Sequence, residues 1–154
     1  MNEPMLHIVL VQPLIPPNTG NVARLCAATG CALHLVEPLG FSLEDRQLKR
    51  AGLDYWEHVA VSVWPDFQHL RQALGDRAFH LFSSRVKRPY TRAPYGSGDA
   101  LVFGNEENGL SDDLLLAHAG GAYTIPMWGA VRSLNLSTSV GIVTYEALRV
   151  IHGF

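Results

Sequence analysis

The sequence predicts a single α/β domain in which helices flank a parallel β-sheet. Short, nearly continuous apolar runs alternate along the chain with longer segments of helical pattern, which is typical of parallel sheets. The length of 154 residues suits one domain and is enough to bury a core. With 47% hydrophobic and 17% charged residues, the composition is that of a folded globular protein.

Glycine, proline and capping residues delimit the expected elements. Pro13 follows the first strand, either Asn18 or Thr19 caps the first helix, and Gly30 ends it. The expected strands cover 6–11, 32–36, 59–63, 78–82, 100–103 and 122–125. The expected helices cover 22–29, 45–51, 66–74 and 135–151, and one more helix starts at 111–113. The apolar stripe of the last helix consists of Val140, Val143, Ala147 and Val150.

Two junctions between a strand and a helix are candidates for a binding site. The first is FGNEENGL, residues 103–110, and the second joins IPM, residues 125–127, to SLNLS, residues 133–137. Small and amide residues let the backbone approach a ligand closely and hydrogen-bond it. Because ligands of parallel sheets lie beyond the carboxyl ends of the strands, we expect both junctions to line one site.

Several side chains in these junctions have two interpretations. Glu106 is either a catalytic carboxylate or a group that accepts backbone N–H bonds or begins a helix, and carboxylates near helix starts are common. Met127 and Trp128 either line an apolar pocket or belong to the core. The polar residues of the second junction either contact a ligand or cap the last helix; they are Ser133, Asn135 and Ser137.

The segment after the first strand offers a third candidate. The amides at the start of its helix are suited to holding a phosphate, Gly20 permits close approach, and Arg24 lies one to two turns further on. A capped helix with a surface arginine is the simpler interpretation. The segment matches neither a Walker loop nor Gly-x-Gly-x-x-Gly, which argues against nucleotide hydrolysis and a standard dinucleotide site.

Composition and motifs also bear on metals, membranes and compartment. The seven histidines show no metal-ligand spacing, and no H-E-x-x-H or paired C-x-x-C motif occurs, so we expect no metal site. No apolar run approaches the ~20 residues of a membrane span, and the first residues lack the regions of a secretory signal. Cys26 and Cys31 are expected to be packed thiols, and the protein is expected in the cytoplasm.

The positive charge is unevenly distributed. The net charge of −2 gives no overall attraction to nucleic acid, yet seven of the 12 Lys and Arg residues fall in two short stretches. Each stretch is either a local phosphate-binding patch or an ordinary solvated surface, since 40–52 and 85–98 are the expected surface excursions. The basic residues are Arg46, Lys49 and Arg50 in the first stretch, and Arg85, Lys87, Arg88 and Arg92 in the second.

Three segments in order resemble the motifs of the SPOUT RNA methyltransferases. The motifs are Asn18-x-Gly20-Asn21-x-x-Arg24, then residues 103–110, then residues 125–127 with 133–137. The segments IPPNTGN, residues 15–21, and RAGLDY, residues 50–55, further resemble the minimal TrmL-type tRNA (cytidine/uridine-34) 2′-O-methyltransferases, and the likeness covers nearly the whole chain. Asn105 stands where some relatives have proline, and WGAV, residues 128–131, is an unusual bridge.

The resemblance implies a C-terminal trefoil knot, S-adenosylmethionine as the cofactor, a homodimer, and 2′-O-methylation of the wobble nucleotide in the tRNA anticodon stem-loop. Both basic stretches become candidates for RNA binding. The candidates for the chemistry are Arg24, Asn18, Glu106 and Ser137, and Arg24 is either the base or a phosphate clamp, because arginine is very hard to deprotonate. The implied cofactor contacts are Phe82, Gly104, Ile125, Met127, Ser133, Leu134 and Asn135.

Two other functions remain open at this point. One is 2′-O-methylation of another RNA, such as ribosomal RNA, and the other is a non-catalytic module that binds RNA or a nucleotide. The joint presence of Arg24, Asn105, Glu106 and Asn135 argues against a module that has lost its chemistry.

Overall fold

A six-stranded, fully parallel sheet forms the centre of the protein, with strand order β3-β2-β1-β5-β4-β6. The computed structural model describes residues 3–154, and residues 52–54 by their backbone only, so Met1, Asn2 and the side chains of 52–54 lie outside the description. The strands are β1 (His7–Val11), β2 (Ala32–Val36), β3 (Val61–Trp64), β4 (Phe79–Phe82), β5 (Ala100–Phe103) and β6 (Ala122–Tyr123). The predicted parallel α/β fold is confirmed.

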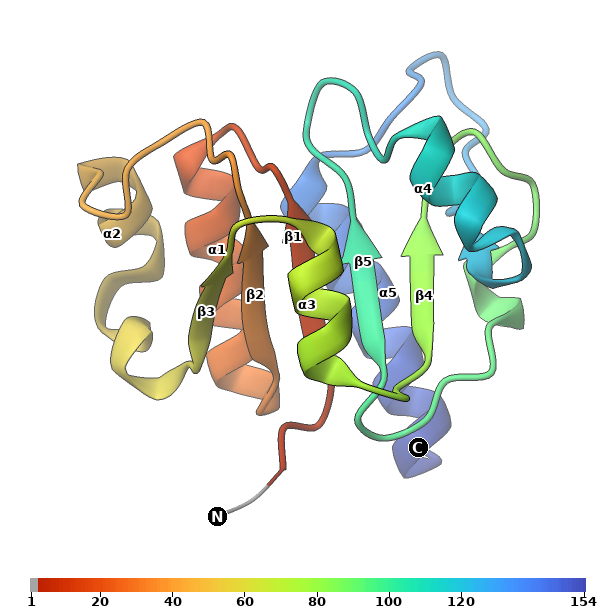
Figure 1. Cartoon of the computed structure of the whole chain (residues 1–154), viewed down its shortest axis with the longest axis horizontal. Coiled ribbons are helices and arrows are strands. Elements are labelled where there is room, and N and C mark those ends of the chain that lie inside the picture. The colour runs from red at the N-terminus through yellow and green to blue at the C-terminus, as the bar shows by residue number, and fades with distance from the viewer. Residues whose placement is uncertain (1–2) are drawn as a thin grey trace.

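Helices cover both faces of the sheet, as Figure 1 shows, and each face has its own core. On one face, α1 and α5 pack against Ile8 and Leu10 of β1; on the other, α3 and α4 pack against Val9. The helices are α1 (Pro16–Thr29), α2 (Arg46–Gly52), α3 (Phe67–Leu74), α4 (Asp112–Ala117) and α5 (Leu136–His152), with short 3-10 turns η1 (Leu53–His58), η2 (Tyr90–Arg92) and η3 (Ala119–Gly121). No helix in the described part of the chain is long and apolar enough to cross a membrane.

The start of α1 differs from the prediction. The helix begins at Pro16, its N-cap is Ile15, and no side chain caps it, so neither Asn18 nor Thr19 is the cap. Proline suits the first helical positions, because its φ is already helical and its missing N–H would have no partner there. Asn18 and Thr19 are buried within the first turns instead. The predicted C-cap is confirmed, since Gly30 has a left-handed φ of 74°.

Two further predictions need correction. Val150 is 43% exposed and is not part of the buried stripe of α5, whereas Val140, Val143 and Ala147 are fully buried. Strand β6 is shorter than predicted because its continuation pairs with the loop after β4. Thr124 N donates to Arg88 O (2.7 Å), and Tyr90 N donates to Thr124 O (2.8 Å). The loop after β4 thus lies directly against the end of β6.

A chain of hydrogen bonds between aromatic rings crosses β1, β2 and β3 on the face covered by α3. Trp64 Nε1 donates to His34 Nδ1 (3.0 Å), and His34 Nε2 lies 2.9 Å from His7 Nδ1. Because Nδ1 of His34 accepts, His34 carries its proton on Nε2 and donates it to His7, and both rings are neutral. Burial lowers the pKa of His7, and burial together with the nearby His7 and Arg77 lowers the pKa of His34 to about 4.

This arrangement predicts that the free energy of unfolding falls with acidification below the unfolded histidine pKa of about 6.5. In this pH range the unfolded chain binds protons at the two histidines, whereas the folded rings stay neutral. Their contribution to the free energy of unfolding is therefore fully present above pH 6.5 and is lost as the pH falls toward the folded pKa values. The loss is at most about 1.4 kcal/mol per pH unit for each ring. Urea unfolding at pH 7.5 and pH 5 measures the effect.

Two variants serve as controls. His34→Gln keeps an acceptor and a donor but does not titrate, so its loss of stability between the two pH values should be smaller than that of wild type. His152→Gln, at an exposed histidine, should keep the wild-type loss. An equal loss in all three proteins would contradict the assignment.

Candidate functional site

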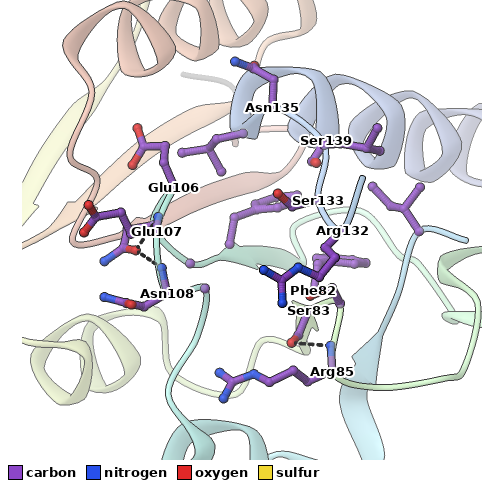
Figure 2. A pocket seen from close by; sticks show the side chains of 18 of the residues that line it. Phe82, Ser83, Arg85, Glu106, Glu107, Asn108, Arg132, Ser133, Asn135 and Ser139 are labelled. Carbon is purple, nitrogen blue, oxygen red and sulfur yellow. Dashed lines mark hydrogen bonds between the residues drawn. The ribbon is translucent and has the colours of Figure 1, made fainter. Parts of the chain in front are cut away.

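A pocket of about 710 Å³ lies where β4, β5 and β6 end, and it is the main candidate site (Figure 2). The loop after β5, the segment after β6 and the residues just before α5 all contribute to its wall. Every residue named from the resemblance as a cofactor contact lines it: Phe82, Gly104, Ile125, Met127, Ser133, Leu134 and Asn135. Asn18 and Glu106 line it too. The two junctions identified in the sequence therefore form one pocket.

The loop after β5 is a compact turn that requires glycine at two positions. A Cβ at Gly104 would lie 2.1 Å from the carbonyl carbon of Gly109 and 2.3 Å from Leu110 N, so only glycine allows this backbone approach. Gly109 has a φ of 67°, in the left-handed region, and its N–H donates to Asn105 O (3.1 Å). The side-chain oxygen of Asn105 accepts bonds from the N–H groups of Glu107 (3.0 Å) and Asn108 (2.7 Å). The loop is thereby fixed in shape at the pocket.

Glu106 joins this loop to the start of α1. Its Oε1 accepts a bond from Leu14 N (2.8 Å), and its Oε2 accepts bonds from Ile15 N (2.9 Å) and Asn18 Nδ2 (3.1 Å). Both carboxylate oxygens therefore accept N–H groups, and two of those groups belong to the backbone at the uncapped helix start. This geometry favours Glu106 as an acceptor of backbone N–H bonds that positions the loop, rather than as a catalytic carboxylate.

The same network continues to α5. Asn135 Nδ2 donates to Asn18 Oδ1 (3.0 Å), and Asn135 Oδ1 accepts bonds from Ser137 Oγ (2.6 Å) and Thr138 N (3.2 Å). Asn135 is therefore the N-cap of α5 as well as part of the pocket wall. Ser137 does not line the pocket, and its hydroxyl is bound to Asn135. One chain of hydrogen bonds thus connects the three sequence segments.

Arg24 lies outside the pocket of its own chain. It is exposed on α1, and its guanidinium stands over the ring of Tyr55, 5.0 Å from the ring centre. The structure of one chain therefore does not bring the predicted catalytic arginine to the predicted cofactor contacts.

The two basic stretches lie beside opposite edges of the sheet. Helix α2 packs against α1 near the β3 edge, whereas the second stretch runs beside β6 at the other edge (Figure 1). Lys49 of the first stretch pairs with Glu44 (2.8 Å), while Arg46 and Arg50 are exposed. One chain consequently does not combine the two stretches into a single patch.

Two arginines of the second stretch are bound within the chain. Arg85 lines the pocket and bonds to Asp112 Oδ1 (2.6 Å) and to the carbonyl oxygen of Leu110. Arg88 donates to Gly120 O (3.1 Å), and its guanidinium lies over the ring of Tyr123. Lys87 and Arg92 are exposed. All four basic residues of this stretch remain candidates for contact with RNA, and the bonds within the chain already orient Arg85 and Arg88.

Sequence reasoning missed Arg132 as a site residue. This exposed arginine lines the pocket, and Figure 2 shows its side chain extending into it. The signal in the sequence was a basic residue directly before Ser133, in a junction already identified.

Met127 and Trp128 were expected either to line a pocket or to belong to the core. Met127 lines the pocket, but Trp128 does neither, since it is 90% exposed. In the part of the chain that the structure describes, no group of three or more His, Cys, Asp or Glu residues is placed to hold a metal ion.

The chain is similar to proteins of one family over nearly its whole length. The SpoU rRNA Methylase family matches residues 5–145. A tRNA (cytidine(34)-2′-O)-methyltransferase of Methylovorus glucosotrophus (strain SIP3-4) is 45% identical and covers 94% of this chain and 95% of that protein. The enzyme of that name from Escherichia coli (strain K12) is 44% identical, over 94% of this chain and 93% of its own length.

Solved structures show the same similarity in three dimensions. One, described as giving structural insights into the 2-OH methylation of C/U34 on tRNA, has a TM-score of 0.93 at 46% identity and covers 97% of this chain and 98% of that one. An AdoMet-bound rRNA methyltransferase from Sinorhizobium meliloti has a TM-score of 0.81 at 26% identity, covering 96% of this chain and 57% of that one.

Proposed function

This chain belongs to the SpoU rRNA Methylase family, and from that membership we propose that it transfers a methyl group from S-adenosylmethionine to the ribose 2′-hydroxyl of the wobble nucleotide of tRNA, cytidine or uridine 34. The observation that carries the proposal is the single pocket formed by the three sequence segments. Relatives that match over more than nine-tenths of both chains are named for this reaction on cytidine 34. The site of action is proposed to be the cytoplasm, where free thiols such as Cys26 and Cys31 stay reduced.

The pocket fits a cofactor of nucleoside size. Its volume of about 710 Å³ lies within the range of about 300–1,000 Å³ for small-molecule sites. Phe82 and Phe103 stack in its wall with ring centres 5.0 Å apart, which provides an apolar surface for a heterocycle. Gly104 lets the backbone of Gly109 and Leu110 pack directly against it, which fixes the shape of this part of the pocket wall. When bound, S-adenosylmethionine supplies an already activated methyl group.

The task left to the protein is alignment of the hydroxyl with the methyl carbon and the sulfur. The network through Glu106, Asn18 and Asn135 holds the three pocket segments in register, so we assign these side chains to positioning the site. Ser137 supports Asn135 from α5. Rigid placement of these groups limits the freedom of the reacting atoms, and such orientation can lower the barrier of a reaction by up to about 7–11 kcal/mol.

We further infer that the active unit is a homodimer in which Arg24 of one subunit completes the pocket of the other. Arg24 is exposed and stands outside its own pocket, which supports action on a partner. Helix α5 packs beside α1 and presents the exposed apolar side chains of Tyr145 and Val150, which a subunit contact would cover. At the reacting centre Arg24 acts either as the base or as a clamp on the adjacent phosphate.

Within one chain the two basic stretches lie at opposite edges of the sheet, and we infer that a dimer brings a basic stretch of each subunit to one RNA. We propose that the tRNA anticodon stem-loop lies across these surfaces. The family fold further implies a trefoil knot made by the segment between β6 and α5. The pairing of Thr124 with Arg88 and Tyr90, in the loop after β4, supports that this segment passes next to that loop.

Methyl transfer to synthetic anticodon stem-loops tests the proposal. With S-adenosylmethionine and no added metal, stem-loops with C34 or U34 should gain one methyl group, mapped by mass spectrometry to the 2′-oxygen of residue 34. A stem-loop with 2′-deoxycytidine at 34 lacks the acceptor and should stay unmethylated.

Other results would give a different function. Methylation of ribosomal RNA but not of the stem-loops would support the proposed methyl-transfer reaction but would refute tRNA as the substrate. Saturable binding of S-adenosylhomocysteine in calorimetry, without methylation of any RNA, would indicate a binding module instead.

A further inference from the structure

Trp128 is an unusually exposed aromatic residue beside the pocket. Its side chain is 90% exposed, and Val131 in the same loop is 69% exposed. Tryptophan gains more free energy from burial than almost any other side chain, so a fully solvated indole suggests a surface that a ligand covers. A Cβ at the neighbouring Gly129 would also meet open space.

The position of the loop limits what can cover this indole. Met127 on one side and Arg132 on the other both line the pocket, so Trp128 stands at its rim. An RNA that delivers a 2′-hydroxyl into the pocket can therefore bring a neighbouring nucleotide to this loop. The segment 125–135 contains no acidic residue, and its one charged side chain is Arg132, so its charge suits a phosphate backbone.

We propose that Trp128 is a stacking platform for an unpaired nucleotide next to the nucleotide that receives the methyl group, a role that rests on the proposed function. Single-stranded loops present unstacked bases, and proteins hold such bases on exposed aromatic rings. Trp128 positions the substrate and takes no part in the chemistry. Arg132, the charged side chain of this segment, lines the adjoining pocket and is assigned to the phosphate next to the stacked nucleotide.

The surface of a second copy of this chain is the competing occupant of Trp128. The absence of acidic residues from the segment 125–135 and its continuity with the pocket favour RNA, since a dimer contact needs neither. The two occupants differ in what a mutation changes: stacking affects the RNA concentration needed, whereas a subunit contact affects the oligomeric state.

Four variants test the proposal with a C34 stem-loop. Trp128→Ala should raise KM for RNA roughly 5- to 100-fold, as expected for loss of one base stack, with little change in kcat or in S-adenosylhomocysteine affinity. Trp128→Phe keeps an aromatic face and should retain most of the RNA affinity, whereas Trp128→Leu keeps apolar area alone and should resemble Trp128→Ala. Val131→Ala, an exposed apolar residue of the same loop, should resemble wild type.

Fluorescence gives a readout independent of turnover. The stem-loop should quench the emission of Trp128 in wild type, and the quenching should be lost in Trp128→Phe, which retains Trp56 and Trp64. Stem-loops with an abasic site at each nucleotide around position 34 should identify the stacked base. At that position the abasic change should weaken binding to wild type but add nothing to Trp128→Ala.

Two results would overturn the stacking role. One is a wild-type KM for Trp128→Ala, and the other is a shift of Trp128→Ala to monomers in light scattering with unchanged RNA affinity per dimer. Failure of the wild type to methylate any stem-loop would instead count against the proposed function, and quenching of Trp128 by that RNA would still report whether the base stacks.

Discussion

Replacing Arg24 by alanine is expected to reduce methyl transfer to the stem-loop by roughly 10²- to 10⁴-fold, the usual contribution of a positioned catalytic group. Binding of S-adenosylhomocysteine should stay close to that of wild type, because Arg24 does not line the pocket. Single-turnover methylation and calorimetry measure the two effects. Arg71→Ala is a matched control, since Arg71 also lies over an aromatic ring, that of Phe79, and should remain active. Turnover of Arg24→Ala at the wild-type rate would refute the assignment.

A mixed dimer tests whether Arg24 acts on the partner. One subunit carries Arg24→Ala, and the other carries Gly104→Val, which disrupts the loop that forms its pocket. If Arg24 acts across the dimer, the intact pocket of the first subunit receives the intact Arg24 of the second, and about half of wild-type activity should return. If Arg24 acts within its own chain, each subunit has one defect and the mixed dimer stays inactive. A monomer mass in light scattering would contradict both the dimer and this arrangement.

Gly104→Ala is expected to weaken cofactor binding strongly. The added Cβ would meet backbone atoms of Gly109 and Leu110 at 2.1–2.5 Å, and backbone cannot move aside as a flexible side chain can. The loop carrying Glu106 must then shift, at a cost on the order of 3 kcal/mol, which corresponds to a roughly 100-fold loss of affinity for S-adenosylhomocysteine. Calorimetric titration measures the affinity, and thermal unfolding reports whether the rest of the domain remains folded.

Two other glycines provide controls for this prediction. Gly129→Ala adds a methyl group to open space in the loop beside the pocket and should bind S-adenosylhomocysteine as wild type does. Gly109 also has open space, but its φ of 67° makes alanine unfavourable by about 1–2 kcal/mol, so Gly109→Ala should lie between the other two variants. Wild-type affinity in Gly104→Ala would show that the loop adapts, against the structure.

Much of the fold follows from local sequence signals. Strands β2 and β5 have the predicted bounds, because a short apolar run between turn residues is a property of the segment itself. Asp66 and Ser111 cap α3 and α4, since each side chain bonds to a backbone N–H only three residues further on. The predicted cofactor contacts meet in one pocket because they follow parallel strands, whose carboxyl ends share one edge of the sheet.

Contacts between distant residues decided the rest. The burial of Asn18 depends on bonds to Glu106 and Asn135, which lie 88 and 117 positions away in the sequence. The sheet order places the two basic stretches at opposite edges, and the fold leaves Arg24 outside its own pocket and Trp128 in solvent. The pattern of one segment reports its own conformation but not which distant segment will pack against it. The elements and the pocket residues were therefore determined by the sequence, whereas the accessibility and orientation of the charged and aromatic side chains were decided by the tertiary structure.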